Sequence, residues 1–452
     1  MTRNVLKNRI LVLSLLFLLL SGAVFAQRVE AAQNDVTLDA EMKAFVVGRV
    51  CRMLVSQYIF PETAKKMEDH LTAQLKQGKY DSVNDVNEFA RVLTVDLRSI
   101  SGDKHLRVTC SPETVRRMRA GSSRSKEERE RERTASIDRE RRRNYGFRRL
   151  EILEGNVGYL DLTGFSGLDE AGETIVAAMN FLANSDAVII DLRQNGGGSP
   201  FTIQIISSYF LKNYTHLNSF EWRGADTLRQ FWTLPFVPGK MMYDTDLYIL
   251  TSSRTFSAAE EFTYNLKNLK RATIVGETTG GGAHPGGNRI VNDYFLVWIP
   301  SGRAINPITK TNWEGTGIEP HIKVDQVQAL DKAHLTALEK LQKKSADEEQ
   351  TFGLKWAMDG LKAELEPFEV KEEILHRYTG KYTRGEVVLE NGQLVLQAGT
   401  RPFKMIPLTE NYFVLDGWDA VRIEFVPDEG AGDYIIKTHM SDGTIEIIKK
   451  MK

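Results

Sequence analysis

Short apolar runs alternate with helical patterns along residues 155–276, and this alternation limits the fold more than any other feature of the chain. The run 187–190 is apolar at every position, as in a strand buried on both faces of a sheet. Residues 169–182 before it have apolar side chains at helical spacing. Neighbouring parallel strands need a long crossover, usually a helix. The pattern therefore predicts an α/β core in which helices cover a mainly parallel sheet.

The flanking regions differ from this core in composition. Residues 35–97 carry apolar stripes at helical spacing, which predicts a small helical module. Between Arg116 and Arg143 there are 12 Lys or Arg and 6 Asp or Glu, with almost no large apolar residues. Such a segment cannot bury a core of its own, so we interpret it as a flexible or solvated-helical insert. After Tyr378, short strand patterns alternate with turns, as in a small antiparallel β-barrel or β-sandwich.

The first residues have the pattern of a secretory signal. Arg3, Lys7 and Arg9 precede the apolar run 10–20, and small residues then lead to Ala26. The run is shorter than the ~20 residues that a spanning helix needs, which argues against an uncleaved membrane anchor. We therefore expect an exported protein with no stable membrane span after cleavage. The predicted division of the chain is a signal peptide at 1–26, a helical N-terminal module at 34–110, a charged flexible insert at 111–146, an α/β core at 147–326, a helical connector at 327–367 and a β-barrel or β-sandwich module at 368–452.

Net charge and cysteine content exclude some partners and leave other questions open. A formal net charge of -1 argues against nucleic acid as a partner. Cys51 and Cys110, in an oxidising compartment, fit either one disulfide or two free thiols. Neither cysteine is assigned to catalysis, and the oligomeric state is not predicted.

Ser257 lies where an apolar strand, 246–250, gives way to a helix. The free N–H groups and the dipole at the start of such a helix favour negative charge. An alkoxide or a tetrahedral oxyanion would develop there, so the position suits the nucleophile of an acyl transfer. The alternative interpretation is structural: Ser257 caps the helix, and Glu260, three residues later, completes a capping box.

A glycine-rich loop follows the buried strand that ends at Leu192. Consecutive glycines let backbone N–H groups approach a ligand without obstruction by side chains. Gly196 or Gly197, together with the N–H of Ala258, would provide the two donors of an oxyanion hole. A tight turn or a phosphate-binding loop are the alternatives, but the spacing fits neither of the common nucleotide-binding fingerprints.

Four segments of the chain, taken in order, resemble C-terminal-processing (tail-specific) serine peptidases. These segments are 191–198, 257–260, 271–282 and 314–320. The resemblance implies a ClpP/crotonase-like core, with Ser257 as the nucleophile and with Ala258 and the glycine loop as the oxyanion donors. It also implies a polypeptide substrate and no metal or organic cofactor.

The expected base depends on the branch of this family. One branch uses a lysine 25 residues after the serine, and Gly282 stands at that position. The other branch, similar to tricorn protease and to the modules of interphotoreceptor retinoid-binding protein, implies His105 as the base and Glu314 as the group that orients it. Lys104 departs from this pattern, because a serine precedes the histidine in tricorn-like members. His284, also beside a glycine-containing turn, is the rival base.

The sequence therefore predicts an exported serine endopeptidase or carboxyl-terminal-processing peptidase. The charged insert stands where processing peptidases carry a carboxylate-gathering PDZ module, so tail specificity does not follow from the resemblance. Arg303 is a candidate for binding a substrate carboxylate, with an ordinary salt bridge as the alternative. The alternative function is a catalytically weak or inactive protein on the same fold that binds peptides or apolar ligands.

Overall fold

The computed structural model describes residues 38–452, except 367, 400, 430–432 and 452. The predicted signal peptide, residues 1–26, lies outside the described residues. Within the described part, no helix has the length and apolar character needed to cross a membrane. The chain forms two compact units. Unit 1 holds the described residues up to Arg133 with Phe220–Arg229 and His284–Ala304, and unit 2 holds Thr134–Ser219, Gln230–Ala283 and Ile305–Lys452.

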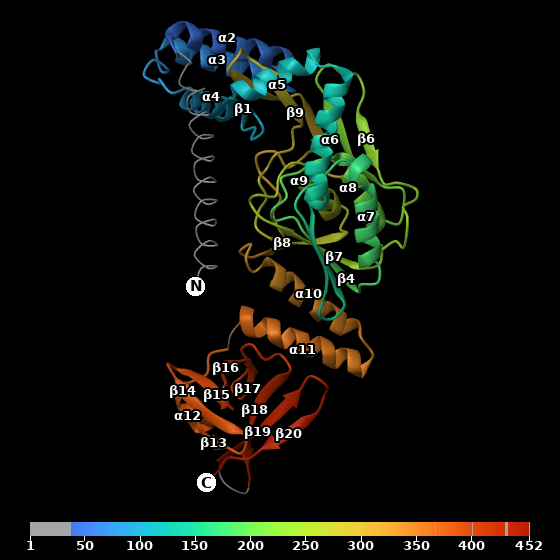
Figure 1. The fold of residues 1–452 in the computed structure, drawn as a ribbon, viewed down its shortest axis with the longest axis vertical. Helices are drawn as coiled ribbons and strands as arrows, with labels where there is room; N and C mark the ends of the chain where they lie inside the picture. Colours follow the sequence, from blue (N-terminus) through green and yellow to red (C-terminus); the bar gives the residue numbers. More distant parts are fainter. Residues whose placement is uncertain (1–37, 367, 400, 430–432, 452) are drawn as a thin grey trace, which may run out of the picture. The chain divides into compact units, whose positions relative to one another are not determined.

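Unit 1 combines helices with a small antiparallel sheet, coloured blue to cyan with two olive-brown strands in Figure 1. The sheet has the order β1-β10-β9. Buried side chains of the helices share one core with Phe295, Val297 and Ile299 of β10. Residues 284–304, predicted within the core at 147–326, therefore pack with the N-terminal module. The elements are α2 (Ala40–Gln57), α3 (Pro61–Lys76), α4 (Val86–Ser101), β1 (Arg107–Cys110), α5 (Pro112–Ser123), β9 (Gly286–Ile290) and β10 (Phe295–Pro300).

Local capping explains where α2 and α4 begin and where α4 ends. The side chain of Asp39 accepts the N–H of Met42 at 2.8 Å at the start of α2. Asp85 does the same for Glu88 at 2.7 Å at the start of α4. Gly102 ends α4 with φ of 68°, a left-handed conformation that glycine adopts at low cost. The turn after this glycine leads directly to Asp103 and the short strand β1.

Unit 2 contains the predicted α/β core. Its sheet has the order β12-β8-β7-β4-β3-β2, in which only β2 runs antiparallel to its neighbour. The strands are β2 (Phe147–Leu153), β3 (Val157–Leu162), β4 (Ala187–Asp191), β7 (Asp246–Thr251), β8 (Ala272–Gly276) and β12 (Ile322–Lys323). The fold class predicted from the sequence, an α/β core with a helical N-terminal region and an antiparallel β module at the C-terminal end, is confirmed.

Both faces of this sheet are covered by helices, as the continuous apolar runs predict. Successive residues of β4 alternate between two cores: Val188 and Ile190 belong to one, and Ala187 and Ile189 to the other. The first core is closed by α7 (Leu168–Leu182), α8 (Pro200–Phe210) and α9 (Ala258–Asn268). The second is closed by α10 (Ala329–Lys344) and α11 (Glu348–Leu365). Burial of the sheet on both sides thus fixes the strand ends from which the loops of the candidate site emerge.

The remaining segments connect the units or extend the core. A third sheet has the order β11-β5-β6, and the boundaries between the units fall within its strands β5 (His216–Trp222), β6 (Arg229–Trp232) and β11 (Gly302–Ile305). The segment predicted as a charged insert contains α5 and α6 (Lys126–Arg142), and α6 buries none of its residues. Both cysteines are free thiols, and burial raises the pKa of Cys51 to about 11.

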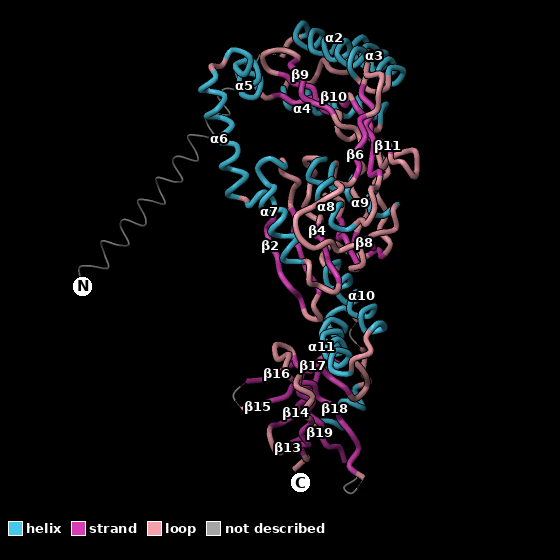
Figure 2. Tube along the Cα trace, turned by 90° about the vertical axis from the view of Figure 1, so that its right-hand side faces the viewer, coloured by secondary structure: helices cyan, strands magenta, loops and turns pink. Residues whose placement is uncertain are grey.

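The C-terminal module is an antiparallel β-barrel whose strands follow one another in chain order from β13 to β20. Figure 2 shows the strands of this module in magenta. The barrel closes where the N–H of Thr383 donates to the carbonyl of Lys449 at 3.0 Å and that of Met451 to Lys381 at 2.7 Å. Its elements are α12 (Glu372–Tyr378), β13 (Gly380–Tyr382), β14 (Gly385–Glu390), β15 (Gln393–Ala398), β16 (Arg401–Pro407), β17 (Tyr412–Leu415), β18 (Val421–Asp428), β19 (Asp433–Met440) and β20 (Ile445–Ile448).

Candidate active site

Ser257 occupies the tight turn between β7 and α9, in a backbone conformation that few residues other than glycine adopt. Its φ is 55° and its ψ is −119°. Such a conformation costs on the order of 1–3 kcal/mol and persists only where the surrounding structure fixes it. Here the N–H of Phe256 donates to the carbonyl of Asn195 at 3.0 Å, and the N–H of Glu261 donates to the carbonyl of Ser257 at 2.9 Å. The turn is therefore held from both sides.

Glu260 joins the serine turn to the loop that follows β8. Its buried carboxylate accepts the N–H of Ser257 at 2.9 Å, Gly282 at 2.8 Å and Gly281 at 2.6 Å, and the hydroxyl of Thr279 at 2.5 Å. Burial raises the pKa of Glu260 to about 7, and these four donors act against the rise. The capping role considered for this glutamate is thus present, and it reaches well beyond the helix start.

The glycine loop after β4 approaches the start of α9 closely. A Cβ on Gly197, where φ is 113°, would lie 2.9 Å from the nitrogen of Ala258 and 3.0 Å from the Cβ of Ser257. Only a glycine leaves the face of the Ala258 N–H open, because any side chain would occupy that space. Among the described residues, neither the Ala258 N–H nor the Gly196 N–H donates to another group. The N–H of Gly197 instead donates to Asn195 Oδ1 at 2.9 Å.

Asn195 holds the glycine loop against the serine turn. Its side chain is fully buried, accepts the Gly197 N–H and donates through Nδ2 to the carbonyl of Leu162 at 2.9 Å. Its own carbonyl accepts the N–H of Phe256. One residue therefore links β3, the glycine loop and the residue before Ser257, which fixes the spacing between the loop and the helix start.

Glu314 lies in unit 2 and contacts the backbone of the loop after β8. Glu314 Oε2 accepts the N–H of Ala283 at 2.5 Å, and the indole N–H of the neighbouring, buried Trp313 donates to the carbonyl of Gly282 at 2.8 Å. Gly282, which stands at the lysine position of the other branch, is thus held through both its N–H and its carbonyl. Ala283 is the last residue of unit 2 before His284.

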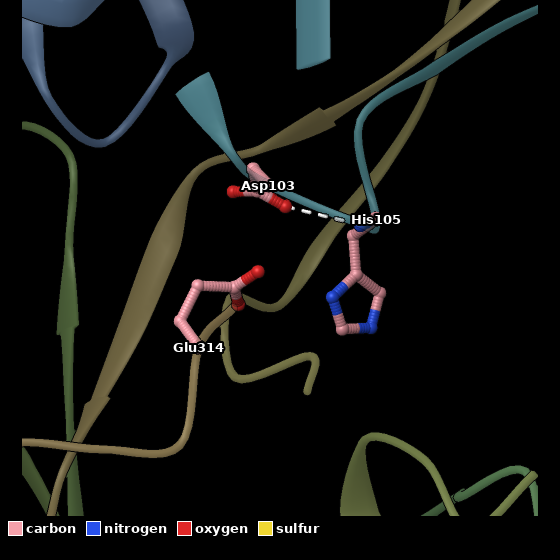
Figure 3. A group of neighbouring side chains, drawn as sticks. All are labelled: Asp103, His105 and Glu314. Atoms are coloured by element: carbon pink, nitrogen blue, oxygen red, sulfur yellow. Dashed lines mark hydrogen bonds between the residues drawn. The ribbon is translucent and has the colours of Figure 1, made fainter. Parts of the chain in front are cut away.

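The two candidate bases lie in unit 1, and the buried Asp103 contacts both. Asp103 Oδ1 accepts the backbone N–H of His105 at 3.0 Å, the dashed line in Figure 3. Asp103 Oδ2 lies 2.8 Å from His284 Nδ1 and accepts the hydroxyl of Tyr58 at 3.2 Å. The ring of Phe60 packs edge-on against the His284 imidazole, with centroids 5.3 Å apart. Asp103 therefore sets the orientation of the His284 ring.

His105 is a buried imidazole with an altered proton affinity. Burial lowers the pKa of His105 to about 4, while the carboxylate of Asp103 acts in the opposite direction. The neutral form, which can accept a proton, therefore prevails throughout the neutral pH range. His284 is also buried.

Arg303 has the ordinary salt bridge that was the alternative to substrate binding. Its Nε lies 2.6 Å from Glu221 Oε2, and its guanidinium lies over the ring of Phe60, 5.5 Å from the centroid. Both charged side chains are about two-fifths exposed, which limits the strength of the pair.

Two models of one peptidase family match this chain. The model described as peptidase family S41 matches residues 156–324. The model described as the N-terminal domain of this family in eukaryotic interphotoreceptor retinoid-binding protein matches residues 26–140. The chain belongs to peptidase family S41. This S41 protein thus has the resemblance that its four motifs predicted, and its membership supports a serine peptidase with a peptide substrate.

Several solved structures are similar to the chain over part of its length. The photosystem II D1 C-terminal processing protease is 21% identical over 38% of this chain and 42% of that one, with a TM-score of 0.31. A lipoprotein from Streptococcus agalactiae is 18% identical over 68% and 98%, with a TM-score of 0.41. Tricorn protease is 13% identical over 66% and 37%, with a TM-score of 0.42. The chain thus spans less than half of the two proteases.

Three residues of the site were not among the predicted site residues: Asn195, Asp103 and Glu260. Asn195 and Asp103 are polar residues of glycine-containing turns. The spacing of residues in the sequence does not indicate which donors form hydrogen bonds with their side-chain oxygens. Glu260 was detectable as the fourth residue of a capping box. Its bonds to residues 279–282 depend on a loop that the sheet brings back to the start of α9, so no local pattern predicts them.

Proposed function

We propose that this chain is an exported serine peptidase in which Ser257 attacks the carbonyl carbon of a peptide bond. A histidine removes the proton from the Ser257 hydroxyl, and the N–H of Ala258 with an N–H of the glycine loop holds the oxyanion that develops. The tetrahedral intermediate then collapses: the C–N bond breaks and the amine leaves with the proton from the histidine. Water hydrolyses the covalent acyl-enzyme that remains, with the same histidine moving the proton. The observation that carries this proposal is the conformation of Ser257 beside the Ala258 N–H, which has no partner among the described residues.

Physical reasons favour the nucleophile over a purely structural serine. A helix cap needs no positive φ, because capping residues normally have extended backbone. The strain at Ser257 is held by bonds from Asn195 and Glu260, an arrangement that is common where strain serves function. The open face at Gly197 leaves the first N–H of α9 available to an anion, which the helix dipole also favours.

Within the glycine loop, we assign the second donor to Gly196. The N–H of Gly197, the other candidate, is already bonded to Asn195. The N–H of Gly196 has no such partner among the described residues. Gly197 then contributes through its missing side chain, which keeps the Ala258 N–H accessible.

For the base we propose His105, with Glu314 as its orienting acid, as the family resemblance implies. One observation favours His284 as the second candidate: Asp103 bonds its Nδ1 at 2.8 Å, as the carboxylate of a catalytic triad bonds its histidine. The variants His105→Gln and His284→Gln distinguish the two, because loss of the base slows acylation of Ser257 by orders of magnitude. Loss of a histidine outside the proton path leaves the acylation rate within a few-fold of the parent.

A fluorophosphonate probe tests the nucleophile directly. The purified protein should be labelled in a time-dependent manner, Ser257→Ala should abolish the labelling, and Ser253→Ala, an exposed serine of the same turn, should retain it. A folded protein that is not labelled, or labelling that survives Ser257→Ala, would refute the proposed nucleophile.

Substrate class and export need separate measurements. We propose an endopeptidase or a carboxyl-terminal-processing peptidase, and a pair of identical peptides with free and amidated C-termini decides between them. Equal cleavage of the pair indicates an endopeptidase, and a strong preference for the free carboxylate indicates tail processing. Export through residues 1–26 predicts a secreted or periplasmic product whose first residue is Gln27, which N-terminal sequencing can establish.

A further inference from the structure

The C-terminal barrel contains a cavity that the proposed peptidase chemistry does not use. Its volume is about 290 Å³, near the lower end of the ~300–1,000 Å³ range of small-molecule sites. Eight-stranded barrels have an interior that side chains can nearly fill or that can hold one small ligand. This barrel does both, because part of its interior is a packed core and part is the cavity.

The cavity wall is apolar because of the alternation along the strands. Ile436 and Met440 of β19, Leu396 of β15, Val421 and Ile423 of β18, and Ile448 of β20 line it with apolar side chains. The other part of the interior is closed by α12, where the Tyr378 ring stacks on Phe425 with centroids 4.1 Å apart. The cavity therefore lies beside a rigid core and has an apolar body of its own.

Thr438 breaks this apolar lining. It lies between Ile436 and Met440 on the inward face of β19, and it is only 7% exposed. Among the described residues, its hydroxyl oxygen has no hydrogen-bond partner. A buried hydroxyl left without a partner is costly, and such groups in native structures call for an explanation. A ligand in the cavity would supply the missing bond.

The open end of the cavity carries charge outside the apolar part. Arg384 and Glu446 form an ion pair at 2.5 Å, with side chains 67% and 42% exposed. Trp418, also at the cavity and 37% exposed, packs against Phe403 with centroids 4.9 Å apart. Since Arg384 and Glu446 already neutralise each other, the interior selects a neutral ligand: an ion placed beside Thr438 would lose its hydration without a counter-charge.

We propose that this barrel is a binding site for a small neutral amphiphile, whose alkyl chain fills the cavity and whose hydroxyl or carbonyl group bonds the Thr438 hydroxyl. The site is separate from Ser257 and does not depend on the proposed peptidase activity. A single charged head group is excluded from the interior, and a large lipid is excluded by the volume.

Isothermal titration of the purified protein with 1-octanol tests the proposal, with octanoate at pH 7.5 as the charged counterpart. We expect saturable binding of octanol, and at least tenfold weaker binding of octanoate. Thr438→Val should weaken octanol binding about fivefold to tenfold, because one hydrogen bond to a neutral group is lost. Ala398→Leu, which fills the cavity from β15, should abolish binding. Thr444→Val, at an exposed turn, is the matched control and should bind as the parent does.

A second measurement separates a binding role from a structural one. Without ligand, Thr438→Val should unfold at the same temperature as the parent or higher, because it removes a buried hydroxyl without a partner. Addition of octanol should raise the unfolding temperature of the parent by more than it raises that of Thr438→Val. Opposite effects on stability and binding support the site. No saturable octanol binding, binding unaffected by Ala398→Leu, or equal binding by Thr438→Val would each overturn the proposal.

Discussion

The clearest test of the oxyanion hole is the substitution Gly197→Ala. The added Cβ would lie 2.9 Å from the Ala258 nitrogen, 3.0 Å from the Ser257 Cβ and 3.1 Å from the Phe256 carbonyl oxygen. Carbon atoms in comfortable contact lie about 3.5–4.0 Å apart, so each of these neighbours must move. The methyl group would also cover the N–H that we assign to the oxyanion.

The expected effect on activity is larger than the effect on stability. Removal of one oxyanion donor lowers kcat by about 100-fold to 1,000-fold. The positive φ of 113° at residue 197 adds strain of about 1–3 kcal/mol for a residue with a side chain. Since native proteins are typically stable by about 5–15 kcal/mol, most of the protein should remain folded. Activity should therefore fall by two to three orders of magnitude in a protein that still unfolds cooperatively.

The assay combines the rate of fluorophosphonate labelling with unfolding in urea. Gly392→Ala is the matched control, since Gly392 has a φ of 78° but a Cβ there meets nothing within 4 Å. Gly392→Ala therefore lowers the stability only through the unfavourable backbone conformation, and it should leave the labelling rate unchanged. If folded Gly197→Ala protein is labelled within about threefold of the parent rate, the Ala258 N–H does not serve as an oxyanion donor and the assignment is wrong.

Two further predictions concern buried titratable groups. Glu260→Gln replaces one acceptor oxygen with an NH2 group, so two of the four buried donors lose their acceptor at a cost of about 1–3 kcal/mol each. Labelling of Ser257 should therefore fall sharply at pH 8. Glu261→Gln is the matched control, because burial also raises the pKa of Glu261 to about 7. This substitution removes a buried carboxylate that is charged at pH 8, so the free energy of unfolding of the variant at pH 8 should exceed that of the parent by up to about 3 kcal/mol. Because the folded pKa of His105 lies near 4, below its unfolded value of 6.5, its neutral form contributes fully above pH 6.5. Urea unfolding should show a loss of about 3 kcal/mol as pH falls from 6.5 to 4, and His105→Asn should lose less; equal losses in both proteins would contradict burial of the imidazole.

The sheet of unit 2 could be predicted because its signals are local and redundant. All five residues of β4 are buried and the first four are apolar, and the helices on both faces contribute apolar side chains to the two cores. The association of residues 284–304 with the N-terminal helices could not be predicted in the same way. Strand β10 pairs with β1 across a long stretch of chain and with its neighbour β9 on the other side, and alternation along a strand does not say which partner it takes.

The site shows the same division between local and long-range signals. Ser257, Ala258 and the glycine loop could be proposed from the sequence because a strand, a turn and a helix start are local features. The partners that hold them were not found, because Asn195 and Glu260 act on backbone groups far away in the sequence. Likewise, the Asp103–His284 pair joins two turns that are adjacent only after β1 and β10 have paired.

Gly282 shows that a position without a side chain can still contribute to a site through its backbone. In the sequence, this glycine is informative only because a lysine is missing from that position. In the structure, its N–H bonds Glu260 and its carbonyl accepts the indole N–H of Trp313. The loop that would otherwise present an amine is here fixed through its backbone, and Glu260 transmits that constraint to Ser257. Because the same carboxylate holds both the loop and the Ser257 turn, displacement of residues 281–282 should also relax the strained backbone at Ser257. The position of residues 281–282 is therefore coupled to that of Ser257 through Glu260.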